Sequence, residues 1–375
     1  MLVKAGFSYY LMRSRLSIMA YPLKFEPILQ PRIWGGDRLK KVLGKPLPAK
    51  SPSTRWGESW ELADLPPGSV KTDSIGADAS GALSSAIASG PWAGRRLRDI
   101  LQQEGEAYLP GRAGEYYPLL IKFLDAREDL SVQVHPTAEY TRSHPGTHLK
   151  TEAWYVLDAA PGSRIYRGLI PGITKEQFQK AIESGRAAEI LQSVPARVGE
   201  CHFLPSGMVH ALGAGVLVAE VQTPSDTTFR IFDWNRLGPD GKPRTLHIQE
   251  ALDVIHFDRP QEVQSPAGRT RQLEDVIIHE LTACDYFTLS RLDFSEGSVH
   301  LPAEILDNQS QVWIILSGQA VLDWPGHGGT ALAPGDTVLL PAQPQGDRPC
   351  YMRVVSPCAV LAARLPARPA RSEAK

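Results

Sequence analysis

Short runs in which apolar and polar residues alternate recur along most of the chain, and this period of two is typical of β-strands. The segment RWGESWELA at 55–63 shows the pattern clearly, with Trp56, Glu58 and Trp60 on one side of the presumed strand. The run YPLLIKFL at 117–124 is a candidate buried strand. Further strands are predicted at 153–157 and 164–167, and in the segments ECHFLP, VLVAEVQ and TTFRIFDW.

Three segments depart from this pattern and predict helices, at about 90–109, 172–194 and 247–257. In the first, Leu97, Ile100 and Leu101 recur at the spacing of one helical face. In the second, Thr174 precedes Gln177 by three residues, which predicts a capping box at the start of the helix. The helices are therefore expected as insertions in a mainly β chain.

Glycine (32 residues) and proline (31 residues) are abundant among the 375 residues, which fits many turns between short strands. Two places also share one order of residues. Gly199-Glu200 leads through a strand to Pro205, and Gly335-Asp336 leads through a strand to Pro341. This internal similarity predicts two related β-barrel units, at 19–262 and 263–366. Residues 1–18 and 367–375 are expected to be a disordered extension and a disordered tail.

Charge, cysteine content and hydropathy exclude several classes of protein. The 40 basic and 41 acidic residues leave a net charge of -1, whereas a nucleic-acid-binding protein usually has a basic excess. The four cysteines form no CxxC pair, so a thiolate zinc site and a disulfide framework are both unfavoured. No apolar run is long enough to span a bilayer, and the N-terminus lacks the architecture of a signal peptide. A cytoplasmic protein with reduced thiols is the resulting prediction.

Four polar side chains could form a metal site. Gln133 and His135 stand two residues apart in SVQVHP, so on a strand their side chains point to the same face. Glu152 begins a predicted strand, and His210 follows a predicted turn at 206–207. An amide, two imidazoles and a carboxylate suit a divalent zinc ion and leave room for water or substrate. Each segment alone is as consistent with packing or hydrogen bonding, and convergence at the mouth of a small barrel is the argument for a metal.

Other candidate motifs are weaker. His144 and His148 are rival ligands, but they lie in the polar segment TRSHPGTHLK and are interpreted as surface histidines. The chain has no P-loop and no GxSxG nucleophile elbow.

Several segments agree in order and spacing with a known family. They are PRIWGG (31–36), WGESWEL (56–62), PLLIKFLDAREDLSVQVHP (118–136), KTEAWYVLD (150–158), GECHFLPSGMVHAL (199–212) and VQTPSDTTFRIFDWNR (221–236). With them the sequence resembles type I mannose-6-phosphate isomerases, which are zinc-dependent cupin enzymes, and most of all their short bacterial branch. The resemblance covers about residues 22–260 and implies two cupin-type jelly-roll barrels. The first would be catalytic, and the second resembles the smaller cupin unit of that branch and lacks metal ligands.

The resemblance also implies roles for individual residues. The metal ligands would be Gln133, His135, Glu152 and His210, the catalytic residues Arg230 and Lys150, and the residues near the substrate phosphate Lys122 and Ser131. One zinc ion would be bound per chain. Its charge would lower the pKa of Lys150, and Arg230 would donate hydrogen bonds to an enediolate. On its own, Arg230 could equally be a surface residue paired with Asp226 or Asp233.

The activity that the resemblance implies is the interconversion of D-mannose 6-phosphate and D-fructose 6-phosphate through an enediol or enediolate. The proton could be moved by Lys150, by a metal-bound water or by a hydride-type shift. The partner is then a small sugar phosphate, with no nucleic acid and no membrane, and the protein is a monomer or a homodimer. Two other readings stay open: a non-catalytic cupin that senses a sugar phosphate, and another metal-dependent cupin enzyme such as an iron dioxygenase.

Overall fold

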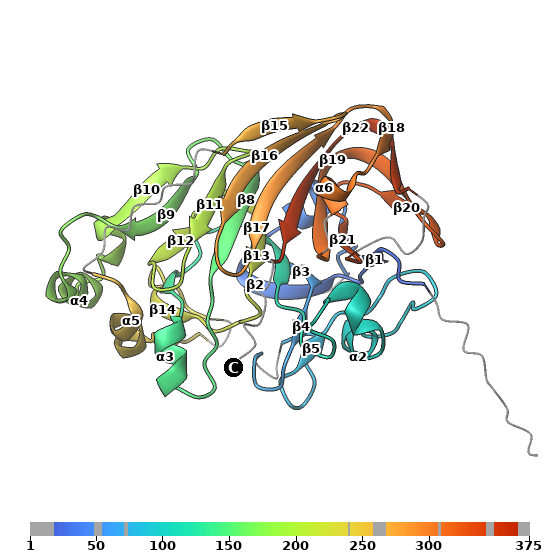
Figure 1. The fold of residues 1–375 in the computed structure, drawn as a ribbon. Coiled ribbons are helices and arrows are strands. Elements are labelled where there is room, and N and C mark those ends of the chain that lie inside the picture. Colours follow the sequence, from blue (N-terminus) through green and yellow to red (C-terminus); the bar gives the residue numbers. More distant parts are fainter. Residues whose placement is uncertain are drawn as a thin grey trace, which may run out of the picture.

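The computed structural model describes residues 19–48, 55–70, 74–238, 241–257, 268–306, 309–342 and 349–366. Within them the chain is mainly β, as predicted, with a few short helices (Figure 1). The expected N-terminal extension at 1–18 and the expected tail at 367–375 lie outside the described residues. No helix in the described ranges has the length and apolar character needed to cross a membrane.

Two antiparallel sheets form the part of the molecule that holds the candidate ligands. The first has the order β11 (Cys201–Leu204), β8 (Glu152–Ala159), β13 (Val216–Gln222), β6 (Leu120–Ala126), β2 (Ile28–Gly36) and β3 (Trp56–Leu62). The second has the order β10 (Leu191–Pro195), β9 (Arg164–Leu169), β12 (His210–Leu212), β7 (Val132–Val134) and β14 (Phe229–Phe232). Strands adjacent in space are often distant in sequence, so the sheets bring remote segments together.

A third sheet of nine strands contains most of the C-terminal part (Figure 1). Its main path is β1 (Leu23–Lys24), β21 (Thr337–Leu340), β19 (Gln311–Trp324), β22 (Tyr351–Arg364), β17 (Thr288–Phe294), β16 (Val276–Ala283) and β15 (Thr270–Leu273). Off this path, β18 (Gly297–His300) pairs with β22 and β20 (Gly328–Leu332) with β19. A two-stranded sheet joins β4 (Asp64–Leu65) to β5 (Leu83–Ser84). The N-terminal strand β1 therefore completes the C-terminal sheet.

The two repeated segments adopt the same local structure. Gly199 and Gly335 both have positive φ, at 90° and 85°. Each glycine begins a turn into a four-residue strand, β11 in one case and β21 in the other. An L-residue with a side chain rarely adopts this backbone conformation, so glycine is required at both turns.

Helices lie within the three ranges where they were expected. They are α2 (Leu97–Tyr108), α4 (Lys175–Glu183) with the 3-10 turn η1 (Ala187–Ile190), and α5 (Ile248–Val254). Thr174 and Gln177 form the capping box at the start of α4: the Thr174 hydroxyl accepts from the Gln177 amide, and Gln177 Oε1 accepts from the Thr174 amide. The sequence did not predict the three shortest helices, α1 (Arg38–Lys41), α3 (Ala138–Ser143) and α6 (Ala303–Leu306).

A buried ion pair joins the first sheet to the C-terminal sheet. Lys45 Nζ lies 2.6 Å from Glu61 Oε2 and donates to the carbonyl of Gly335 at 2.8 Å. Both side chains are less than a tenth exposed. Glu61 also accepts a hydrogen bond from the Ser59 hydroxyl. On β3 these two residues alternate with Glu58 and Trp60, which belong to the opposite face.

We expect Lys45→Met to lower the free energy of unfolding by about 3 kcal/mol, because the Glu61 carboxylate would stay buried without its cation. Urea denaturation followed by circular dichroism measures the change. The matched control is Lys41→Met, since Lys41 pairs with Asp37 on the surface and both side chains are more than half exposed. That variant should differ from the wild type by less than about 0.5 kcal/mol. Equal effects of the two substitutions would contradict the assignment of a stabilising buried pair.

Candidate active site

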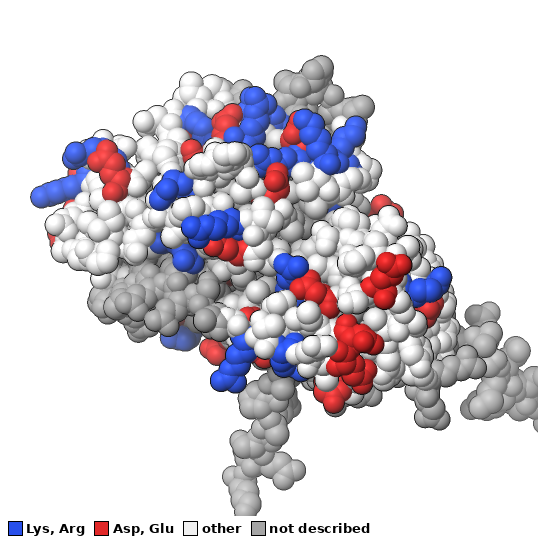
Figure 2. Space-filling view, turned by 90° about the horizontal axis from the view of Figure 1, so that it is seen from above, with Lys and Arg blue, Asp and Glu red and all other residues white. Residues whose placement is uncertain are grey.

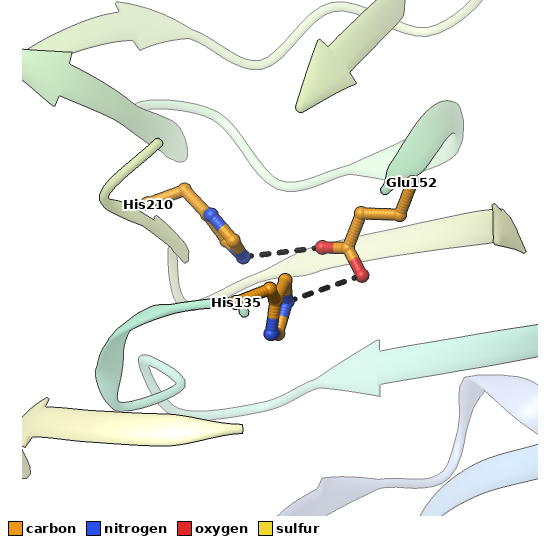
Figure 3. A group of neighbouring side chains, drawn as sticks. All are labelled: His135, Glu152 and His210. Carbon is orange, nitrogen blue, oxygen red and sulfur yellow. Dashed lines mark ion pairs between the residues drawn. The ribbon is translucent and has the colours of Figure 1, made fainter. Parts of the chain in front are cut away.

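Three predicted metal ligands meet between the two sheets of the N-terminal part. His135 follows β7, Glu152 begins β8 and His210 begins β12. Their potential ligand atoms all lie within 4.8 Å of one another, and all three side chains are fully buried. Glu152 Oε2 lies 3.4 Å from His135 Nε2, and Glu152 Oε1 lies 3.1 Å from His210 Nε2. Figure 3 shows the three side chains pointing toward one another.

The chemistry of these groups fits a divalent metal ion. The other ring nitrogen of each histidine faces a backbone carbonyl, which favours a proton on Nδ1 and leaves Nε2 free as a ligand. His135 Nδ1 lies 3.2 Å from the Thr227 oxygen, and His210 Nδ1 lies 2.9 Å from the Met208 oxygen. His135 Nε2 is buried without a hydrogen-bond partner in the described chain, and the buried Glu152 carboxylate faces both imidazoles. Buried polar atoms of this kind are costly unless something binds them.

Protonation states in the cluster also suit metal binding. Burial and the charge of Lys150 lower the pKa of His135 to about 3, so its imidazole is neutral at physiological pH. Burial alone would raise the pKa of Glu152, but Lys150 and His135 outweigh it and hold that pKa well below its usual range. Neutral imidazole and ionised carboxylate are the forms that bind metals.

The strand register places the remaining candidates around this cluster. On the five-stranded sheet, Arg230, Gln133, His210 and Arg167 stand opposite one another in successive strands. On the six-stranded sheet the corresponding row is Trp60, Lys122, Glu220, Trp154 and His202. Residues directly opposite in a ladder share one face of the sheet. The rings of Trp154 and His210 are 5.4 Å apart, so the two rows face each other.

A cleft of about 1270 Å³ opens beside the cluster. Five predicted site residues line it: Lys122, Ser131, Gln133, Lys150 and Arg230. Gln133 Nε2 lies 3.3 Å from His210 Nε2, so the amide stands between the cluster and the cleft. The cleft is larger than the roughly 300–1,000 Å³ of most small-molecule pockets, which leaves ample room for a monosaccharide phosphate.

Lys150 connects the cleft to the cluster. Its Nζ lies 2.9 Å from Glu152 Oε2, and the side chain is almost completely buried. Burial would lower the pKa of Lys150, but the carboxylates of Glu152, Glu220 and Asp226 outweigh burial and raise it. The protein's own charges therefore favour the ammonium form of Lys150. The lowered pKa of Lys150 that the sequence analysis expected would require the positive charge of a metal ion beside Glu152.

Lys122 lies at the bottom of the cleft among groups that balance its charge. Its Nζ is 4.4 Å from the centre of the Trp60 ring, 3.7 Å from Glu220 Oε1 and 3.5 Å from Asp226 Oδ1. The side chain is only 3% exposed. Ser131, also buried, lines the same cleft. A phosphate held by Lys122 would have to compete with these two carboxylates.

Arg230 lies on the wall of the cleft. The structure shows no ion pair with Asp226 or Asp233. Instead, Arg236 and Arg244 bind Asp233, each with a nitrogen 2.7 Å from a carboxylate oxygen. Arg230 Nη1 donates to the Thr245 carbonyl at 2.9 Å, and its Nε is buried without a hydrogen-bond partner in the described chain. Burial, together with Arg244, lowers the pKa of Arg230 to about 10, so the guanidinium stays charged at neutral pH.

Sequence reasoning missed Glu220. Its Oε2 accepts a hydrogen bond from Trp154 Nε1 at 2.8 Å, and the side chain is 2% exposed and lines the cleft. Burial and the neighbouring Glu152 raise the pKa of Glu220. One signal was available, since Glu220 is the only charged residue in the mostly apolar segment VLVAEVQ.

Neither rival histidine belongs to the cluster. His144 is exposed and its ring stacks on Tyr140, with ring centres 3.8 Å apart. His148 is half-buried, and its Nε2 lies 3.5 Å from the Ser69 hydroxyl.

The fold and this cluster together define a cupin-type β protein with a candidate metal centre beside a cleft. Comparison with known proteins then identifies the family. A family model described as "Phosphomannose isomerase type I, catalytic domain" matches residues 23–162. The chain belongs to the type I phosphomannose isomerase family, which confirms the assignment from the sequence.

Two similar sequences and one similar crystal structure come from Bacillus subtilis. A probable mannose-6-phosphate isomerase, GmuF, is 35% identical over 302 residues, which are 78% of this chain and 88% of that protein. The mannose-6-phosphate isomerase ManA is 34% identical over 327 residues, which are 85% and 93% of the two chains. The crystal structure of a mannose 6-phosphate isomerase has a TM-score of 0.77 at 26% identity and covers 92% of this chain and 99% of its own.

Proposed function

We propose that this protein interconverts D-mannose 6-phosphate and D-fructose 6-phosphate with one Zn²⁺ held by Gln133, His135, Glu152 and His210. The observation that carries the proposal is the buried trio of His135, Glu152 and His210, whose potential ligand atoms lie within 4.8 Å of one another beside the cleft. Family membership supports the same reaction, since the relatives are named for it.

Two imidazoles and a carboxylate are typical of a catalytic zinc site with an open position. Gln133 Nε2 lies 3.3 Å from His210 Nε2, and the amide oxygen of the same side chain is the fourth proposed metal ligand, on the cleft side. When bound, a zinc ion holds sugar oxygens and polarises the carbonyl as a Lewis acid.

The chain's own residues supply the other parts of an aldose–ketose isomerisation. This reaction moves a proton between C1 and C2, and negative charge develops on the sugar oxygens. Arg230 donates hydrogen bonds to that charge, because its guanidinium lines the cleft and has no ion-pair partner within the part of the chain that the structure describes. Lys150 holds a proton beside Glu152 and can pass it to a sugar oxygen.

The phosphate group is proposed to lie near Lys122 and Ser131, which line the cleft together. The mixed surface charge does not oppose an anionic substrate. Figure 2 shows acidic and basic side chains interspersed over one face of the molecule, without a field of one sign. Binding therefore depends on the few cations inside the cleft.

A coupled isomerase assay with and without a chelator tests the proposed function. Purified protein should convert fructose 6-phosphate and mannose 6-phosphate into each other, lose this activity in the chelator, and recover it with Zn²⁺. Metal analysis of protein purified without added metal distinguishes zinc from iron. Binding of the sugar phosphate without turnover would favour a sensor, and iron with no isomerase activity would favour another cupin enzyme.

A further inference from the structure

We propose that Gln30 is a positioning residue that holds one wall of the cleft in place by hydrogen bonding to the backbone of Ile75. This inference rests on the proposed function, because the cleft is taken to bind the sugar phosphate. The wall consists of the described cleft-lining residues that follow β4, namely Gly68, Ser69, Val70, Ser74 and Ile75.

The side chain of Gln30 bonds to both backbone groups of one residue. Gln30 Nε2 donates to the Ile75 carbonyl at 2.8 Å, and Gln30 Oε1 accepts from the Ile75 amide at 3.1 Å. Gln30 lies on β2 and is 1% exposed. The carboxamide thus imitates a paired residue in a β-ladder, and only a side chain with one donor and one acceptor at this length can do so.

Packing alone does not hold Ile75 in position. Its side chain is 38% exposed, so it contributes little to the core. The small apolar cluster nearby contains Val70, Leu83 and Trp60 but not Ile75. The paired hydrogen bonds to Gln30 therefore tie Ile75 to β2 at the edge of the cleft.

The other end of the wall reaches the segment that carries Lys150. Ser69 is 5% exposed, and its hydroxyl lies 3.5 Å from His148 Nε2. The His148 amide donates to the Thr227 hydroxyl, and the His148 carbonyl accepts from the Ser225 hydroxyl. The described residues of the wall thus contact β2 at Ile75 and the segment before Lys150 at Ser69.

Gln30 itself is separate from the metal cluster. Among the described residues, the Gln30 side chain hydrogen-bonds to Ile75, and its partner in the β2–β3 ladder is Glu58. A variant without the carboxamide should therefore weaken substrate binding while leaving the groups that perform the chemistry in place. Such a change raises KM with little effect on kcat.

Gln30→Met tests this proposal because it keeps the length of the side chain and removes both hydrogen bonds. We expect KM for fructose 6-phosphate to rise about tenfold and kcat to stay within about twofold of the wild type. Amide hydrogen exchange at Ile75 should become faster. Gln30→Asn, whose side chain is one methylene shorter, should change KM and exchange in the same direction, and it serves if Gln30→Met does not fold.

Gln311→Met is the matched control. Gln311 is also a fully buried glutamine, and its Nε2 donates to the Ile305 carbonyl at 2.6 Å, but it lies in the C-terminal sheet and does not line the cleft. That variant should lower stability and leave KM and Ile75 exchange unchanged. A similar rise of KM in Gln311→Met, or an unchanged KM in a Gln30 variant with faster Ile75 exchange, would overturn the proposal.

Failure of the proposed function has a different signature. If the wild type turns over neither sugar phosphate, the isomerase assignment is wrong, whatever the Gln30 variants do. In that case the affinity for fructose 6-phosphate, measured by calorimetry, replaces KM. Weaker binding by the Gln30 variants than by Gln311→Met supports the positioning role of Gln30. Equal binding by the variants, or no binding by any form of the protein, rejects that role.

Discussion

His210→Ala is expected to lose the bound metal ion and the isomerase activity together. His210 Nε2 lies 3.1 Å from Glu152 Oε1 in a fully buried cluster, and alanine would leave that carboxylate facing a gap. The variant would retain one imidazole, the carboxylate and the amide of Gln133, which is one donor fewer than a closed tetrahedral shell. We expect kcat to fall about 10³-fold or more, because a catalytic metal contributes several kcal/mol to stabilising the transition state.

Metal content per chain, measured by mass spectrometry beside the turnover rate, tests the ligand assignment. His144→Ala is the matched control, since His144 is an exposed histidine outside the cluster. The control should keep both metal and activity. A full complement of metal in His210→Ala would remove His210 from the ligand set, and a circular dichroism spectrum like that of the wild type would exclude unfolding as the cause of a loss.

Arg230→Ala is expected to keep the metal and lower kcat about 10²- to 10³-fold. Removing one preorganised donor to a developing oxyanion typically costs this much. Arg230 is suited to the role because its guanidinium lines the cleft, and among the described residues its buried Nε has no hydrogen-bond partner and its charge no ion-pair partner. Arg230→Lys should recover little of the loss, since a lysine cannot present two parallel donors.

The control for this prediction is Arg236→Ala. Arg236 is close enough to Arg230 to act on its pKa, and it donates to Asp233 at 2.7 Å, but it does not line the cleft. Its substitution should leave kcat within a few-fold of the wild type. If Arg230→Ala lost metal as well as activity, Arg230 would instead act by holding Gln133, its partner in the β14–β7 ladder.

The sequence predicted some features of the site well because they depend on local structure. Two residues separated by one position on a strand share a face, and Gln133 and His135 accordingly both lie at the cluster. The capping box at Thr174 could also be foreseen, since it involves residues only three apart. Local patterns also offered Glu152 and His210 as candidate ligands but left packing as an equal alternative, and the family resemblance decided in favour of a metal site.

Other features could not be foreseen because they depend on which strands become neighbours. Glu220 meets Lys122 and Trp154 only through the β6–β13–β8 ladder. The two ion-pair partners considered for Arg230 are wrong, since Arg236 and Arg244 take Asp233. The bond from Gln30 to Ile75 spans 45 residues and joins a strand to a loop.

The sequence by itself determined that the chain is mainly β, where its turns require glycine, and which family it belongs to. These properties follow from local backbone preferences and from the identity of residues at particular positions. Only the tertiary structure decided which charges are balanced and which are free. Lys150 and Lys122 both lie close to carboxylates, whereas no carboxylate of the described residues forms an ion pair with Arg230. The physical reason is that electrostatic energy depends on distance and burial, and sheet pairing between remote strands sets both.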